Sequence, residues 1–119
     1  RLEAMEKRWA EARVTAATLI DVCPEEPAGW VHHSYSLHEL NRTREAMDQL
    51  LPAAERFPRA LVIPYNLACY ACQLGDLKEA SRWLGRAAAL GGRAVVAKMA
   101  SRDPDLEPLR SEFDSWVGD

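Results

Sequence analysis

Two cysteines separated by two residues, Cys69 and Cys72, are the first residues of this sequence whose spacing suggests chemistry. In thiol–disulfide exchange the first cysteine of such a pair lies at a helix N-terminus, which lowers its pKa. The predicted helix begins near Ala60, so Cys69 lies about two turns inside it. No second Cys-x-x-Cys follows to complete a zinc site. We therefore interpret both cysteines as small residues of a packed or groove-facing helix, with thiol or metal chemistry as the alternative.

Three histidines, His32, His33 and His38, share one predicted helix and are the candidate partners for such a metal site. His38 is a possible third ligand beside the cysteines of a neighbouring helix. His32 and His38 are six residues apart, and helical ligand pairs lie three or four apart. His33 falls on the predicted core face, where a hydrogen-bonded buried histidine is expected. Neither a metal nor another cofactor is predicted.

Catalytic signatures are otherwise missing from the sequence. It contains no phosphate-binding glycine loop, no Gly-x-Ser-x-Gly and no His-Glu-x-x-His. Two pairs of acids, Glu25 with Glu26 and Asp103 with Asp105, fall at predicted helix boundaries. Helix capping explains acids at such positions better than acid–base catalysis does. We predict that the protein is not an enzyme.

The length of 119 residues, with 48% apolar and 28% charged residues, suits one soluble globular domain. No apolar stretch approaches the length that a bilayer requires, and no secretory leader is recognisable. Three cysteines are an odd number for a disulfide framework, so free thiols and a cytoplasmic location are expected. The net charge of −3 is concentrated in the acidic residues after Ser101. Without a basic stripe, nucleic acid is not an expected partner, and neither is a membrane.

A repeat of 34 residues organises the chain. Ala12, Ala46 and Ala80 are spaced at 34 residues, and four residues after each comes Ala16, Leu50 or Leu84. The pairs Pro24 and Pro58, and Trp30 and Pro64, keep the same spacing. Such a period predicts a stack of supersecondary units.

Helical spacing of apolar and small residues occurs in each copy. One predicted face carries Trp30, His33, Ser34 and Leu37, and the next carries Ala46, Leu50, Ala53, Ala54 and Phe57. Asn41 and Gly75 are the predicted helix stops, because both residues tolerate the left-handed conformation. Asp76 with Glu79 fits a capping box, and Pro52 predicts a kink.

These residues resemble the tetratricopeptide repeat (TPR), whose 34-residue pattern is W-x2-L-G-x2-Y, then A-x3-F, then P. The first copy reads Trp30, His33, Ser34, Leu37, Ala46, Leu50 and Pro58, and the second reads Pro64, Leu67, Ala68, Ala71, Ala80, Leu84 and Gly92. The resemblance implies an all-α superhelix of antiparallel helix pairs, with about six to seven helices. His33, Leu37, Pro64 and Ala71 depart from the pattern, but the small residues at helix contacts remain.

The resemblance implies one domain over residues 1–119. It consists of a partial repeat at 2–26, repeats at 27–60 and 61–94, and a C-terminal capping segment at 95–119. A short helix is expected over 93–101. Trp83 is one of the less settled tryptophans, and Trp116 either closes the core or docks on another chain.

TPR proteins bind partners with the first helix of each pair, which lines the concave groove. The positions expected to face this groove are His32, Tyr35, His38 and Glu39 in one repeat and Tyr65, Asn66, Cys69 and Gln73 in the next. Tyrosine suits recognition of a peptide or helix. Only Asn66 matches the family's carboxylate clamp, so that ligand class is not expected. The predicted function is non-catalytic binding of another protein or peptide, and the runner-up is self-association through residues 2–22 or 105–117.

Overall fold

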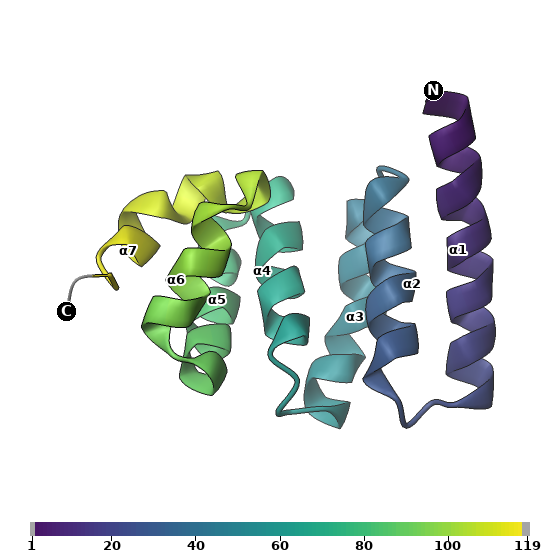
Figure 1. The fold of residues 1–119 in the computed structure, drawn as a ribbon, viewed down its shortest axis with the longest axis horizontal. Helices are drawn as coiled ribbons and strands as arrows, with labels where there is room; N and C mark the ends of the chain where they lie inside the picture. Colours follow the sequence, from purple (N-terminus) through teal and green to yellow (C-terminus); the bar gives the residue numbers. More distant parts are fainter. Residues whose placement is uncertain (1, 118–119) are drawn as a thin grey trace. The chain divides into compact units, whose positions relative to one another are not determined.

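The computed structural model describes residues 2–117, and helices account for every regular element in that range (Figure 1). The elements are α1 (Leu2–Val22), α2 (Pro27–Glu39), α3 (Thr43–Arg56), α4 (Val62–Gln73), α5 (Leu77–Gly91), α6 (Arg93–Ser101), the 3-10 helix η1 (Pro104–Leu109) and α7 (Arg110–Asp114). The predicted all-α class and helix number are thus confirmed. No helix within residues 2–117 has the length and apolar character that crossing a bilayer demands.

The helices fall into two compact units. Unit 1, up to Pro58, contains α1 to α3, and unit 2, from Arg59, contains α4 to α7 with η1. Within unit 1, α2 packs against both α1 and α3 (Figure 1). Within unit 2, α5 packs against α4 and α6, while η1 lies on α4. The single domain expected over residues 1–119 and its repeat boundaries stay predictions.

The helix ends follow the predicted local chemistry. Asn41 adopts a φ of 62° and Gly75 a φ of 82°, both in the left-handed region that terminates a helix. The Asp76 side chain accepts a hydrogen bond from the Glu79 backbone N–H at 3.2 Å, which caps α5. The Glu79 carboxylate pairs with Arg82 instead of completing a reciprocal capping box. Helix α3 continues through Pro52, which is exposed.

The core of unit 1 lies between α2 and α3. The buried side chains there include Ser34 and Leu37 from α2 and Ala46, Leu50, Ala53 and Ala54 from α3. These residues include most of the two predicted faces, and their small members permit close helix contact. The Trp30 indole Nε1 donates to the Pro24 carbonyl at 3.1 Å, so this ring also ties α2 to the preceding turn.

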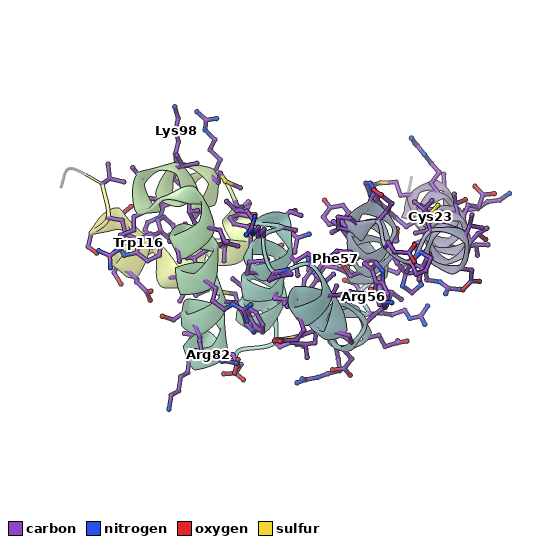
Figure 2. All side chains as sticks on the ribbon, turned by 90° about the horizontal axis from the view of Figure 1, so that it is seen from below. Cys23, Arg56, Phe57, Arg82, Lys98 and Trp116 are labelled. Carbon is purple, nitrogen blue, oxygen red and sulfur yellow. The ribbon has the colours of Figure 1, made fainter. Side chains whose placement is uncertain are left out.

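The core of unit 2 is closed by the C-terminal elements. Leu67 and Leu84, from α4 and α5, are buried together with Leu106 of η1 and Phe113 of α7. The short helix expected over residues 93–101 is confirmed as α6. Trp116, labelled in Figure 2, is half-buried, and the Arg93 guanidinium lies 5.9 Å from its ring centroid. The last buried aromatic ring of the unit is therefore Phe113.

Candidate protein-binding surfaces

A groove of about 310 Å³ runs between α1 and α2 in unit 1. Its lining residues are Trp9, Ala12, Thr15, Ala16 and Leu19 from α1 and His32, Tyr35 and Ser36 from α2. Most of these side chains are apolar, aromatic or small. We call this surface the α1–α2 groove.

An aromatic pair lies in the α1–α2 groove. The rings of Trp9 and Tyr35 meet edge to face, with centroids 5.4 Å apart and planes at 73°. Tyr35 remains 42% exposed, so its ring is available to a ligand although it already contacts Trp9. The ring centroid of His38 lies 6.4 Å from that of Tyr35. Such pairs hold a rigid ring face with polar edges, which suits protein recognition.

Close packing of α1 against α2 positions this pair. Ala16 and Ser36 are buried where the two helices meet, so small side chains allow the approach. At Gly29 a Cβ atom would lie 3.2 Å from the backbone nitrogen of Ile20 and 3.1 Å from its Cγ1. Contacts this short are tighter than most real Cβ contacts, so a side chain at Gly29 would require α1 to move by a few tenths of an ångström. The groove therefore depends on small residues at this helix crossing.

The four predicted positions of unit 1 differ in their surroundings. His32 is exposed and lines the α1–α2 groove, as Tyr35 does. His38 is half-buried, and its Nδ1 lies 2.9 Å from the Thr43 hydroxyl. Glu39 is exposed and does not line the groove. The structure thus brings His32 and Tyr35 together on one open surface.

Two of the predicted positions of unit 2, Tyr65 and Cys69, lie beneath the chain's own residues, whereas Gln73 is exposed. The Tyr65 hydroxyl donates to Asp103 Oδ2 at 3.0 Å, and the Cys69 thiol approaches the same oxygen at 3.5 Å. The Gln73 side-chain amide donates to Asp105 Oδ1 at 3.1 Å. Tyr65 and Cys69 are only 7% and 5% exposed, so a partner could reach them only after displacing the segment that carries Asp103.

The remaining position of unit 2, Asn66, is partly exposed on α4. Tyr65, Cys69 and Gln73 are spaced at four residues, which aligns them along one side of α4. Residues 103–105 follow this side and accept a hydrogen bond from each of the three side chains. This side of α4 is therefore already occupied by an intramolecular ligand.

The environment of the cysteine pair keeps both thiols protonated. Burial, reinforced by the Asp103 carboxylate, raises the pKa of Cys69 far above its ordinary value. Burial and the nearby Asp105 raise the pKa of Cys72 to about 11. A reactive cysteine needs the opposite shift, toward the thiolate. All three cysteines are free, and the described residues contain no group of three His, Cys, Asp or Glu side chains placed to hold a metal.

Two residues of these surfaces, Trp9 and Asp103, make contacts beyond those that the sequence predicts. Trp9 was expected only as part of the partial repeat at 2–26, and it also lines the α1–α2 groove. Asp103 was expected to cap a helix, and its Oδ1 does accept the Asp105 backbone N–H at 3.1 Å. Its second oxygen binds Tyr65 and Cys69, which are 38 and 34 residues away. No local pattern predicts contacts at that separation.

Comparisons of the chain with protein-family models, with curated proteins and with solved structures find no match.

Proposed function

We propose that this chain is a non-catalytic TPR-type protein that binds another protein or a peptide through the α1–α2 groove. The all-α fold and the small residues at helix contacts support the repeat assignment. The protonated, covered thiols of α4 support binding rather than thiol catalysis. The three free cysteines favour a reducing compartment such as the cytoplasm.

The observation that carries the proposal is the open aromatic pair of Trp9 and Tyr35 in a groove of about 310 Å³. This groove can accommodate a few side chains of an extended peptide or of a helix. Tyr35 and His32 add hydroxyl and imidazole groups at its edge, where they can select polar atoms of the ligand. Aromatic anchors of this kind supply much of the energy at protein interfaces.

The test uses two identical substitutions on the same helix. Thr15 lines the α1–α2 groove, whereas Thr18 is exposed on α1 outside that lining. Thr15→Arg should fill the groove and abolish binding, and Thr18→Arg should leave binding unchanged. Both variants and Tyr35→Ala would be used as bait in cell lysate under reducing conditions, with captured proteins identified by mass spectrometry. Circular dichroism would establish that each variant keeps its helicity.

A partner captured by wild type and Thr18→Arg but lost from Thr15→Arg and Tyr35→Ala would support the proposal. Equal capture by all four proteins would contradict it and move the binding surface elsewhere. Light scattering over a range of concentrations would test the alternative of self-association. A mass that rises with concentration, and falls back on truncation within residues 2–22 or 105–117, would favour that alternative.

A further inference from the structure

Among the described helices that contain a lysine or arginine, α6 is the one without an acidic residue. Arg42, Arg82 and Arg110 pair with carboxylates three or four residues away on their own segments. Over Arg93–Ser101, α6 carries Arg93 and Lys98 and no acidic residue, and Arg102 follows as its C-cap. Within residues 2–117 none of these three cations forms an ion pair. Their positive charge therefore has no local compensation.

The nearest acid along the chain forms no ion pair with the cations of this helix within residues 2–117. Asp103 follows Arg102 directly, but its carboxylate accepts from Tyr65, from Cys69 and from the Asp105 backbone. Lys98 projects away from α6 on the outside of unit 2 (Figure 2). The ammonium and guanidinium groups of Lys98 and Arg102 are thus available to an acidic partner.

Apolar side chains lie beside these cations. Val95 is 55% exposed and Met99 is 36% exposed, and their spacing of four residues aligns them along α6. Lys98 and Arg102 are both exposed and are also four residues apart. They form a second row on the surface of α6, next to the row of Val95 and Met99. The opposite side of α6 is buried in unit 2 through Val96, Ala97 and Ala100. One exposed face therefore presents an apolar row next to a basic row.

We propose that this α6 face is a second docking surface, which binds an acidic amphipathic helix of a partner protein. The apolar row would pack against the partner's apolar residues, and the basic row would pair with its carboxylates. Rows at four-residue spacing are the ridges by which helices interlock, which favours a helical partner over an extended one. The proposal rests on unit 2 alone and does not depend on the α1–α2 groove.

Two oppositely charged probes test the proposal on the full chain. One synthetic amphipathic helix would carry leucines on one face and glutamates beside them, and its matched counterpart would carry lysine at every glutamate position. Binding would be measured by fluorescence anisotropy at low salt and at about 0.5 M salt, where surface charge pairs are strongly screened. The glutamate peptide should bind at low salt and shift the amide NMR signals of α6. Its affinity should fall at high salt. The lysine peptide should not bind.

Charge variants locate the surface. The double variant Lys98→Glu, Arg102→Glu should bind the glutamate peptide with an affinity lower by about tenfold or more, and it should allow the lysine peptide to bind. Lys98→Gln with Arg102→Gln removes the same cations with less disturbance of the helix end, and it should weaken binding as well. The matched control is Arg44→Glu with Lys78→Glu, which changes net charge equally at exposed positions of α3 and α5.

Three results would overturn the proposal. The first is absence of binding by the glutamate peptide, and the second is equal binding of both peptides. The third is equal weakening by the control pair, which would show an effect of net charge alone. Vesicles with and without anionic lipid would be measured in parallel. Binding to anionic vesicles without binding of the glutamate peptide would assign the α6 face to a membrane surface instead.

Discussion

Asp103 is the residue on which the C-terminal segment of unit 2 depends. One of its carboxylate oxygens caps η1 through the Asp105 N–H, and the other accepts the Tyr65 hydroxyl and the Cys69 thiol. Hydrogen bonds to a charged acceptor contribute about 1.5–3 kcal/mol each when they are partly buried. This side chain therefore holds the segment against α4 with several contacts at once.

We expect Asp103→Asn to lower the free energy of unfolding by about 1–3 kcal/mol, because the substitution removes the charge from these hydrogen bonds. Urea denaturation measures the loss. Asp114→Asn is the control, because its ion pair with Arg110 is exposed and the loss there should be below about 0.5 kcal/mol. A double-mutant cycle with Tyr65→Phe should give a coupling energy of about 1 kcal/mol. Additive losses would show that the Tyr65–Asp103 contact contributes nothing.

At the scale of elements, the contact between α1 and α2 decides the shape of the α1–α2 groove. Gly29 lies where a Cβ would press on the backbone nitrogen of Ile20 at 3.2 Å. A backbone atom of α1 can yield only if the helix itself shifts. Small residues at this crossing are therefore a requirement of packing, whereas the glycine at position 85 of α5 faces open space.

We expect Gly29→Ala and Gly85→Ala to have opposite effects on stability. Alanine favours a helix over glycine by about 1 kcal/mol, so Gly85→Ala should stabilise the chain by up to that amount. At Gly29 the overlap with Ile20 should outweigh this gain and destabilise by about 1 kcal/mol. Thermal or urea unfolding of both variants measures the difference. Equal stabilisation by the two substitutions would mean that α1 shifts at no cost.

The α6 face and the covered side of α4 show how differently two helices of one unit can be used. Tyr65 and Cys69 of α4 find a hydrogen-bond partner in Asp103 and are buried beneath it, so this part of α4 is closed. The exposed face of α6 keeps its basic and apolar rows open. Within unit 2, partner binding is thus expected at α6 rather than at the predicted α4 positions.

At the scale of the whole molecule, we expect the free energy of unfolding to be nearly constant around neutral pH and to fall in acid and in alkali. Burial, with Arg13 and Arg42 nearby, lowers the pKa of His33 in unit 1. In unit 2, burial and neighbouring acids raise the pKa of Tyr65 and Cys69, and that of Cys72 to about 11. Each shift disfavours the charged form in the folded state.

The sign of each effect follows from which state takes up or releases the proton. The unfolded chain protonates His33 below its ordinary pKa of 6.5 while the folded chain resists, so stability falls as the pH drops below that value. Unfolded thiols ionise near pH 9.0 while the folded ones stay protonated, so stability also falls as the pH rises above that value. Each group contributes a slope of about 1.4 kcal/mol per pH unit at most.

Urea denaturation across the pH range would measure this profile. His33→Gln should reduce the pH dependence of stability in acid only. The double variant Cys69→Ala, Cys72→Ala should reduce it in alkali only. Hydrogen exchange should show amides of unit 1 losing protection first in acid and those of unit 2 first in alkali. If His33→Gln loses stability below pH 6.5 as steeply as the wild type does, other groups cause the acid dependence.

The sequence alone determined the helical elements. Apolar and small residues at three- and four-residue spacing marked the helices, and Asn41 and Gly75 marked two of their ends, because these signals act within a few residues. Ser34, Ala46, Ala68 and Ala80 were expected at helix contacts, and all four are fully buried. The groove positions were less predictable, because periodicity says which side of a helix a residue occupies but not what covers it.

Only the tertiary structure decided which surfaces remain open. Tyr35 and Cys69 occupy equivalent positions 34 residues apart, yet one is 42% exposed and the other 5% exposed. The difference comes from Asp103, whose contacts with α4 form only when the chain folds back on itself. Likewise, the α1–α2 groove exists because the side chains of Trp9 and Tyr35, 26 residues apart, meet across two packed helices. Contacts between distant residues depend on packing, which no local pattern of residues specifies.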